Sequence, residues 1–227
     1  MIERLPGGPP EQGADRSSGP TRVIVAITGA SGVTYGVRAL ELLGDCGVET
    51  HLVITRSGIA TLSHETDLSA RHVKNLAAVV HSPSDLGASS SSGSFPIDGM
   101  LVAPCSVRTL SGIANSYDED LVVRAADVTL KERRRLVLLL RETPLHAGHL
   151  RLMAQATEAG AVVMPPVPAF YSRPTTIQDI VDDTVHRALD LLGLPLEHDR
   201  RWTGAARGPT TVLAQHQAHD PTEDIGT

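Results

Sequence analysis

Short apolar runs alternate along the chain with segments whose apolar residues recur every three or four positions. The apolar runs lie at Val23–Ile27, His51–Thr55, Gly99–Ala103, Leu136–Leu140 and Ala161–Met164. The helical patterns cover Val33–Leu43, Ser57–Leu62, Ser106–Ala114, Leu145–Ala159 and Ile177–Leu192. Several runs are continuously apolar, which is typical of strands that are buried on both faces. The alternation therefore predicts one α/β domain, a doubly wound parallel sheet with helices on both faces.

Both ends of the chain and one internal segment differ in composition from the rest. Residues 1–20 are rich in Gly, Pro, Ser and charge, and residues 204–227 have a similar composition without serine. We therefore expect a disordered N-terminal extension and a flexible C-terminal tail on either side of a domain at 21–203. Ser84–Pro96 reads SDLGASSSSGSFP, which predicts a flexible, low-complexity loop.

The overall composition excludes several classes of protein. The 227 residues carry a net charge of −6, which disfavours nucleic-acid binding because phosphate contacts need a basic surface. Only two cysteines occur, so neither a disulfide framework nor a cysteine zinc site is expected. No apolar run approaches the roughly 20 residues that a membrane span needs, and the N-terminus lacks the apolar stretch of a signal peptide. We expect a protein of the reducing cytoplasm.

A turn of small residues follows the first strand. Arg22–Gly36 reads RVIVAITGASGVTYG, which is the order strand, glycine turn, helix. Unpaired N–H groups at a helix start favour an anion. Gly29 and Gly32 would let the backbone approach a phosphate, and Ser31 would add a hydroxyl. The turn predicts a phosphate-bearing ligand, and a tight turn without any ligand is the alternative.

The same turn indicates which phosphate ligand to expect. It lacks the full G-x-G-x-x-G spacing, and no acidic residue follows the second strand to hold a ribose, since that strand ends in Thr55-Arg56-Ser57. A dinucleotide is therefore disfavoured, whereas a mononucleotide such as FMN fits.

A second turn of this kind follows the third predicted strand, in the sequence Ala103-Pro104-Cys105-Ser106-Val107-Arg108-Thr109. The hydroxyls of Ser106 and Thr109 either cap the next helix alone or also bond a phosphate or a ring edge. No fixed base is evident beside Cys105, so we expect a small buried residue there rather than a nucleophile.

Charged and aromatic residues follow the later strands. Arg124 and Lys131 lie seven residues apart and so can share a helix face, with a solvated face as the alternative. Arg141 and Glu142 end the fourth predicted strand, at the sheet edge where ligands bind in such folds. The proline-rich loop before Tyr171 predicts an aromatic wall for a ligand, and a plug for the core is the other interpretation. The ten histidines show no metal-binding spacing.

These motifs, in this order, resemble the flavin prenyltransferase family (UbiX-type). The matching stretches are TGASG with Tyr35-Gly36, HETD at 64–67, PCS at 104–106 with Thr109-Leu110, RAADVTLKERR at 124–134, RETPL at 141–145, PPVPAFY at 165–171 and the helix that carries Arg187. The resemblance covers roughly residues 22–203.

The resemblance implies a fold, an activity and an assembly. The family has a Rossmann-like, flavodoxin-type fold and forms a homododecamer in which protomers share the site. It transfers a dimethylallyl group from dimethylallyl phosphate to N5 and C6 of reduced FMN without a metal. The product, prenylated FMN, serves as the cofactor of UbiD-type decarboxylases.

The resemblance also implies site residues. The positions matching FMN contacts are Gly29, Ala30, Ser31, Ser57, Ser106, Val107, Arg108, Thr109 and Arg141. The positions matching the donor site are Arg124, Lys131, Tyr171 and Arg187, and those expected to be catalytic are Ser31, Glu65, Lys131 and Glu142. Either Glu142 or the released phosphate would accept the proton that ring closure sets free.

Two other functions remain open at this point. An FMN-dependent cysteine decarboxylase would share the fold, although the PxMNxxMW-like substrate motif and the catalytic histidine of that class are absent from the sequence. A non-catalytic carrier of FMN or prenylated FMN would keep both turns but would not need the charged residues of the donor site.

Overall fold

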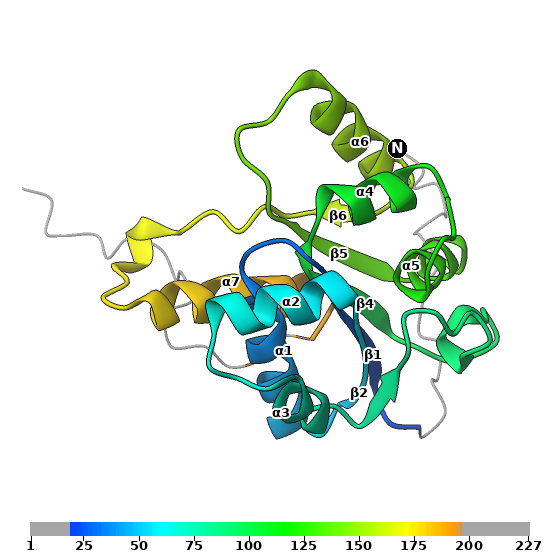
Figure 1. Ribbon diagram of the computed structural model, residues 1–227, viewed down its shortest axis with the longest axis horizontal. Coiled ribbons are helices and arrows are strands. Elements are labelled where there is room, and N and C mark those ends of the chain that lie inside the picture. The colour runs from blue at the N-terminus through cyan, green and yellow to red at the C-terminus, as the bar shows by residue number, and fades with distance from the viewer. Residues whose placement is uncertain (1–18, 195, 197–227) are drawn as a thin grey trace, which may run out of the picture.

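A six-stranded parallel sheet forms the centre of the computed structural model, which describes residues 19–194 and 196 (Figure 1). The strands are β1 (Arg22–Ile27), β2 (Glu49–Ile54), β3 (Val79–His81), β4 (Gly99–Cys105), β5 (Arg135–Leu140) and β6 (Val162–Val163). Their order across the sheet is β3-β2-β1-β4-β5-β6, and all neighbours are parallel. The order reverses between β1 and β4, which is where ligands bind in doubly wound sheets.

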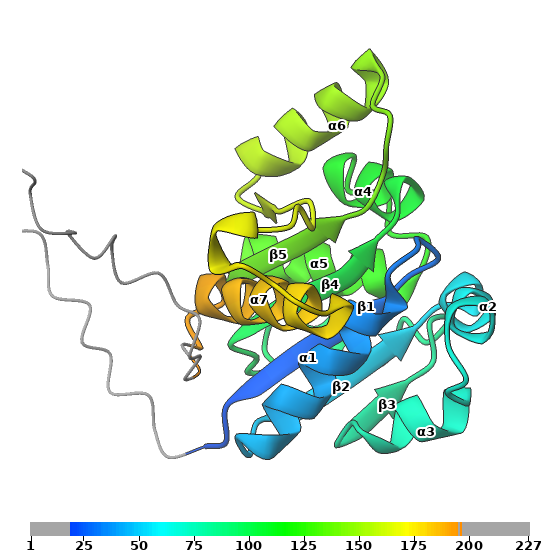
Figure 2. The ribbon, with the colours of Figure 1, turned by 90° about the vertical axis from the view of Figure 1, so that its left-hand side faces the viewer.

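Helices cover both faces of this sheet, as the sequence predicts. They are α1 (Val33–Asp45), α2 (Arg56–Glu65), α3 (Ala70–Asn75), α4 (Val107–Ala114), α5 (Leu121–Lys131), α6 (Ala147–Glu158) and α7 (Ile177–Leu191), with short 3₁₀ turns η1 (Ser89–Ser91) and η2 (Phe170–Ser172). Figure 2 shows α1 and α7 on one face and α4 and α5 behind the sheet. The prediction of a doubly wound, Rossmann-like α/β domain is confirmed.

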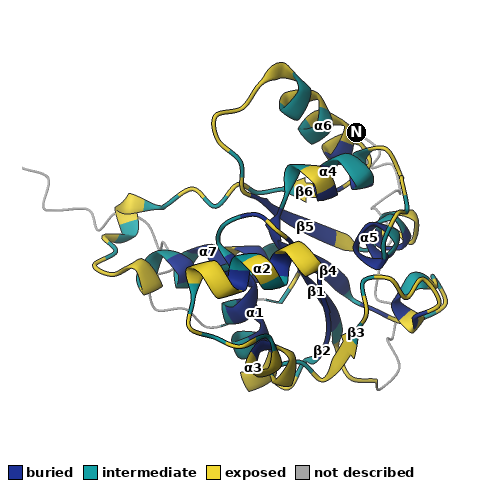
Figure 3. Cartoon of the chain, in the orientation of Figure 1, coloured by how far each residue is buried: buried dark blue, intermediate teal, exposed yellow. Residues whose placement is uncertain are grey.

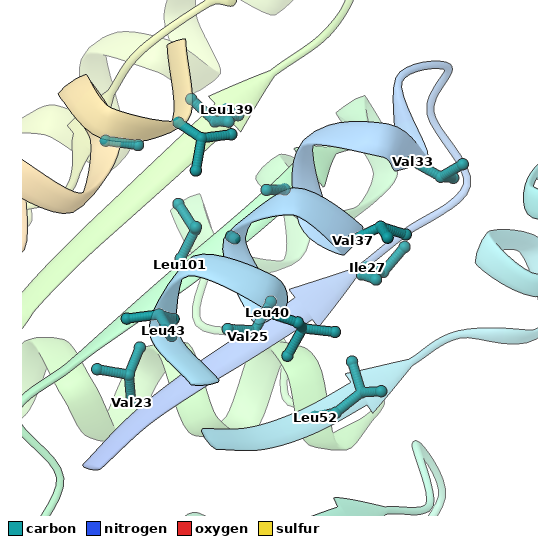
Figure 4. Close-up of a cluster of buried hydrophobic side chains, with 14 of the residues drawn as sticks. Val23, Val25, Ile27, Val33, Val37, Leu40, Leu43, Leu52, Leu101 and Leu139 are labelled. Carbon is teal, nitrogen blue, oxygen red and sulfur yellow. The ribbon is translucent and has the colours of Figure 1, made fainter. Parts of the chain in front are cut away.

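The alternation of side chains along β1 divides the core into two halves. Val23, Val25 and Ile27 point toward α1 and α7, whereas Ile24 and Ala26 pack with α4 and α5 on the other face. All five side chains are fully buried, and Figure 4 shows the first three beside α1. Burial on both faces explains why β1 reads as a continuous apolar run.

Helix α1 presents one apolar stripe to the sheet. Val33, Val37, Leu40 and Leu43 are spaced three or four residues apart and all point to the same core cluster (Figure 4). The helix begins after Gly32, whose φ of 99° lies in the left-handed region that favours glycine. The small-residue turn therefore sets the direction in which α1 leaves the sheet.

One short strand and one short α-helix were not predicted from the sequence. Strand β3 has three residues at the edge of the sheet, and Val79 and Val80 stay exposed there (Figure 3). Helix α3 has six residues and a single buried one, Val73. Each is too short to produce a recognisable hydrophobic period.

Helix α5 carries the charged run for which the sequence allows two interpretations, a functional face and a solvated face. Most of the helix is buried, including Val122, Ala125 and Val128. Arg124 and Lys131 both lie on this helix, and their spacing of seven places them on nearly the same side of it. The prediction that they share a helix is confirmed.

The predicted terminal segments 1–20 and 204–227 lie outside the described residues, apart from residues 19 and 20. None of the helices in the described part of the chain is long and apolar enough to cross a membrane.

Candidate functional site

The two small-residue turns after β1 and β4 are bonded to each other. Thr28, which is buried, donates from its hydroxyl to the carbonyl of Pro104 at 2.7 Å. The same hydroxyl accepts a hydrogen bond from the backbone N–H of Ser106 at 2.9 Å. Because β1 and β4 are neighbours at the point where the strand order reverses, both turns face one crevice.

An open cavity of about 760 Å³ lies at this edge of the sheet. Its walls include Thr55 and Ser57 after β2, and Ser106, Arg108 and Thr109 at the start of α4. The cavity has the volume of a typical small-molecule site. Arg108 stands at its exposed rim, paired with Glu119 at 2.8 Å.

Two helices begin at this cavity. Thr55 caps α2 by accepting from the N–H of Gly58 at 3.0 Å, and Ser106 caps α4 by accepting from the N–H of Thr109 at 3.2 Å. The capping function predicted for Ser106 is confirmed. Two helix N-termini in one cavity favour an anion such as a phosphate group.

Gly29 brings the first turn close to α2. A Cβ at this position would lie 2.5 Å from Cβ and 2.6 Å from Oγ of Ser57, so only glycine fits without a shift. The predicted FMN contacts Gly29 and Ser57 therefore touch in the structure. The residues present fit FMN, because hydroxyls and two helix N-termini meet in a cavity of suitable size, and the backbone of Gly29 packs against Ser57 in its wall.

The carboxylate of Glu65 lies at the N-terminus of α1. The sequence does not predict this contact. Oε2 of Glu65 accepts from the N–H of Gly32 at 2.8 Å and of Val33 at 3.1 Å, and the carboxylate also bonds the side chain of Ser31. The sequence predicts a ligand phosphate for these N–H groups. In the structure, Glu65 accepts from two of these N–H groups, so only the N–H groups before Gly32 remain for a ligand.

Electrostatics keep Glu65 ionised. Partial burial alone would raise its pKa, but the hydrogen bonds from Ser31, Gly32 and Val33, with the positive charge of Arg141, outweigh burial and hold the pKa below its ordinary value. Glu65, the last residue of α2, therefore stabilises the first turn as a carboxylate and links the turn to the end of this helix.

Removing the charge of Glu65 is expected to make the fold less stable in a pH-dependent way. Glu65→Gln should lower the free energy of unfolding by about 0.5–1 kcal/mol near neutral pH, because a charge at a helix N-terminus is lost. Since the folded-state pKa is depressed, this stabilisation is full above the unfolded-state pKa and is lost as pH falls through the folded-state pKa. Urea denaturation of both proteins from about pH 7 down to about pH 3 measures it.

The matched control for this experiment is Glu158→Gln at the C-terminal end of α6, where loss of a negative charge is not expected to destabilise. A stability difference between Glu65→Gln and wild type that persists unchanged at acid pH would contradict an electrostatic role for Glu65.

Arg141 and Glu142 follow β5 at the same edge of the sheet. The backbone N–H of Arg141 donates to the carbonyl of Cys105 at 3.1 Å, which ties this segment to the second turn. Glu142 accepts from the N–H of Thr143 at 3.0 Å. The structure thus brings Ser31, Glu65 and Arg141 into one electrostatic group, with Glu142 next in sequence.

Cys105 is a buried core residue, as the sequence predicts. Its side chain is fully buried, and this burial raises the pKa of the thiol to about 12. A thiol with such a pKa is not ionised at neutral pH and is a poor nucleophile. Among the residues described, no group of three or more His, Cys, Asp and Glu side chains could hold a metal ion.

The remaining predicted residues lie elsewhere on the chain. Tyr171 is exposed and lies in η2. Ser172, the last residue of η2, donates to the Asp183 carboxylate on α7 at 2.6 Å. Arg187 is exposed one helical turn after Asp183. Neither Tyr171 nor Arg187 lines the cavity. Val107 lines a separate groove between α4 and α6.

Lys131 and Arg124 are also separated from this chain's own cavity. Lys131 is the last residue of α5 and lies four residues before Arg135. Arg135 is the register partner of Gly99 at the amino end of the strands, which is the end opposite the cavity. Along the helix axis Lys131 lies about 12 Å beyond Val123, which lines the cavity. Arg124 is half-buried and bonded within the chain, to Asp118 at 2.9 Å.

Known proteins share this fold and sequence. Residues 12–189 match the Flavoprotein family model. The flavin prenyltransferase UbiX of Salmonella typhimurium is 58% identical over 187 residues, covering 81% of this chain and 99% of that relative. The crystal structure of AnUbiX (PadA1) in complex with FMN and dimethylallyl pyrophosphate has a TM-score of 0.78 at 49% identity, covering 82% of this chain and 98% of that one.

A dodecameric FMN-dependent UbiX-like decarboxylase from Escherichia coli O157:H7 gives a TM-score of 0.79 at 48% identity, covering 81% of this chain and 100% of that one. The high identity extends over nearly the whole length of these relatives. The chain therefore belongs to the Flavoprotein family and, within it, to the UbiX-type flavin prenyltransferases.

Proposed function

We propose that this protein transfers the dimethylallyl group of dimethylallyl phosphate to reduced FMN, which yields prenylated FMN, the cofactor of UbiD-type decarboxylases, and inorganic phosphate. The observation that carries the proposal is the junction of two features at one sheet edge. A cavity that fits a flavin mononucleotide adjoins an electrostatic group, made of Ser31, Glu65 and Arg141, that suits a second phosphate.

The residues of the proposed site divide between two tasks. We assign FMN binding to Gly29, Ala30, Ser31, Ser57, Ser106, Val107, Arg108, Thr109 and Arg141. We assign the donor to Lys131, Tyr171 and Arg187, with Glu142 or the released phosphate as the proton acceptor. Arg124 belongs to this second group by sequence, but its side chain is already bonded within the chain.

Cleavage of an allylic C–O bond becomes easier when the charge of the departing phosphate is stabilised. Reduced FMN supplies the nucleophile when it is bound. The Ser31 hydroxyl, beside the Glu65 carboxylate, would contact that phosphate, and the positive charges of Arg141 and Lys131 would favour its release. The exposed ring of Tyr171 is suited to exclude water from an allylic carbon.

We also propose that the complete site needs several copies of the chain. Lys131 and the cavity lie at opposite edges of the sheet, so Lys131 can serve only the cavity of a second copy. A homododecamer accounts for this arrangement, and the E. coli O157:H7 relative is dodecameric. We place the protein in the cytoplasm, where its unpaired cysteines Cys46 and Cys105 stay reduced.

Incubation of the protein with reduced FMN and dimethylallyl phosphate under anaerobic conditions tests the activity. We expect the flavin to gain one C5H8 unit, detected by mass spectrometry, together with stoichiometric inorganic phosphate. A cysteine decarboxylase would instead release CO2 from a peptide with a C-terminal cysteine, and a carrier would bind flavin without any adduct.

Two variants separate an enzyme from a carrier. Glu142→Gln and Lys131→Ala should each slow adduct formation by about 100-fold or more while FMN still binds. Turnover at the wild-type rate in both variants would show that these residues are not catalytic and would favour the carrier.

A further inference from the structure

A pair of histidines joins the edge strand β3 to the rest of the sheet. Nδ1 of His51, on β2, lies 2.9 Å from Nε2 of His81, on β3, and the two rings stack with their centroids 5.1 Å apart. His51 is buried, with 2% of its surface exposed. Neither histidine belongs to the proposed site, yet a titratable group in a buried position is costly unless its protons have partners.

The surrounding bonds determine which nitrogen carries each proton. Nε2 of His51 lies 3.0 Å from Oε1 of Glu49, and a carboxylate only accepts, so this nitrogen donates. In the neutral ring, Nδ1 of His51 is then an acceptor, and the Nε2–H of His81 donates to it. The same oxygen of Glu49 accepts from Nε of Arg22 at 2.8 Å. The hydrogen bonds therefore run in one direction, from His81 through His51 to Glu49.

This chain of bonds accommodates one additional proton but not two. A proton added to Nδ1 of His81 leaves the bond from its Nε2–H to His51 in place. With both rings protonated, each of the two facing nitrogens carries a hydrogen, and neither is left to accept. Two positive charges then also lie side by side in a poorly hydrated position. The second proton therefore breaks the contact between β2 and β3.

Charged groups from several elements surround the pair. They are Glu49 on β2, Arg22 at the start of β1, Asp85 in the loop after β3, and Asp98, which precedes β4 and accepts from the backbone N–H of Arg22 at 2.9 Å. Burial lowers the pKa of His81, and the neighbouring His51 lowers it further, while Asp85 opposes both. The neutral form of His81 is therefore favoured near neutral pH.

Strand β3 has little else to hold it in the sheet. It has three residues, which pair with β2 on one side. Val79 and Val80 are 36% and 42% exposed, so they bury little apolar surface (Figure 3). An edge strand with so few buried contacts opens more easily than the core. The contact of His81 with His51 is therefore a large part of what holds β3.

The aromatic neighbour of His51 is held independently of β3. The ring of Phe95 meets His51 edge-on, with centroids 5.2 Å apart. Phe95 ends the serine-rich segment, Ser89–Phe95, in which Arg134 donates to the carbonyls of Gly93 and Phe95 at 2.8 and 2.9 Å. Arg124 donates to the carbonyl of Ser91 in the same segment at 3.3 Å. Loss of the histidine contact therefore frees β3 and leaves the segment in place.

The end of β3 leads directly into the wall of the cavity. Pro83 lies two residues after His81 and lines the cavity. Its carbonyl accepts at 2.8 Å from the N–H of Leu121 at the start of α5, between the cavity-lining residues Asp120 and Val123. A displacement of β3 is therefore transmitted to this wall.

We propose that the contact between His51 and His81 is an acid-sensitive clasp, which holds β3 and the Pro83 wall of the cavity at neutral pH and opens when both rings are protonated. FMN then binds less tightly at acid pH. The opening of β3 stands on the contacts alone. The effect on FMN rests on the proposed function, since it takes the cavity as the flavin site.

The test measures the full-length protein at about pH 8 and about pH 5.5. Hydrogen–deuterium exchange without flavin, corrected for the intrinsic effect of pH on exchange, gives the protection of peptides that cover residues 77–83. Fluorescence titration gives the Kd of FMN. Glu49 stays ionised at both pH values, because its hydrogen bonds with Arg22 and His51 hold its pKa below the ordinary value. The variants are His81→Gln, whose amide can still donate to His51 but does not titrate, and His81→Phe.

In the wild type, the protection of β3 should fall about tenfold between the two pH values. Because the pKa of His81 is lowered in the folded state, the stability of closed β3 is full above the unfolded-state pKa of about 6.5 and is lost as pH falls below it. Peptides that cover residues 89–95 should keep their protection. Both His81 variants should lose the pH dependence, since neither side chain accepts a proton.

The affinity for FMN needs a comparison between proteins, because the phosphate of FMN itself titrates near pH 6. Only the difference between the wild type and His81→Gln therefore reports on the clasp. Between about pH 8 and about pH 5.5, the wild type should lose about fivefold more affinity than His81→Gln. By the same coupling, saturating FMN should restore the protection of β3 in the wild type at about pH 5.5.

His72→Gln is the matched control. His72 is exposed on α3, just before β3, so the substitution removes an imidazole from a neighbouring position without touching the pair. This variant should keep the pH dependence of the wild type in both measurements. Melting temperatures within a few degrees of the wild type at about pH 8 would exclude global unfolding of the variants.

Equal protection of β3 at both pH values in the wild type would overturn the clasp, and so would a fall that persists in both His81 variants. Opening of β3 with the same loss of FMN affinity in the wild type and in His81→Gln would overturn its coupling to the cavity. Absence of FMN binding by the wild type at about pH 8 would refute the proposed function and the effect on FMN, while the exchange measurement would still decide the clasp.

Discussion

Gly36→Ala is expected to lower the free energy of unfolding by about 3 kcal/mol or more, a large part of what a domain of this size has. Gly36 is buried in α1, where the helix crosses the sheet. A Cβ there would overlap the carbonyl oxygen of Ala103 and lie 2.7 Å from Cγ1 of Ile27. Because the carbonyl belongs to the sheet backbone, α1 itself must move away. Urea denaturation measures the loss.

Gly44→Ala in the same helix is the matched control. Gly44 is exposed near the end of α1, and nothing lies within 4 Å of an added Cβ. Alanine should therefore raise stability by about 0.5–1 kcal/mol, because it has the higher helix propensity. If Gly36→Ala were as stable as wild type, the close contact between α1 and β4 could not be a constraint on the fold.

The sheet and its ligand-binding edge could be predicted from local sequence. A run such as Val23–Ile27 is apolar at every position, and burial on both faces of a parallel sheet requires that pattern. The turns after β1 and β4 could be placed at one edge because parallel strands all end on the same side. The bonds between Thr28 and Pro104 and between Ser106 and Thr28 confirm that the turns are adjacent.

The partner of the first turn could not be predicted in this way. Glu65 lies more than 30 residues after Gly32, and its contact depends on the direction in which α2 runs from its cap at Thr55. The sequence identifies Glu65 only through the resemblance of HETD to a family motif. Its effect on the N-terminus of α1 follows from tertiary packing.

The position of Lys131 relative to the cavity was likewise not available from periodicity. A spacing of seven shows that Arg124 and Lys131 lie on one side of a helix, but not toward which edge of the sheet the helix ends. The bonds from Arg124 and Arg134 to the serine-rich segment left no signal either, because they end on carbonyl groups, which every residue has.

The loss of one hydroxyl at Ser31 is expected to have the largest effect on the reaction. Ser31→Ala should lower kcat about 100- to 1,000-fold, as removal of one preorganised donor does in other enzymes, while the Kd of FMN changes less than about threefold. In the structure, the Ser31 side chain bonds the Glu65 carboxylate, which Gly32 and Val33 hold in place. The hydroxyl therefore lies beside the charged group at the first turn.

Single-turnover formation of the flavin adduct and fluorescence titration with FMN distinguish the roles that Ser31 can have. Ser63→Ala is the matched control, since Ser63 is exposed on α2 and its hydroxyl only donates to the carbonyl of Ala60 at 2.8 Å. A tenfold weaker Kd for FMN with an unchanged rate would make Ser31 a flavin contact and nothing more. A slower rate with intact FMN binding requires a group that acts on the donor, because alanine leaves the backbone of the turn and the two N–H bonds to Glu65 in place.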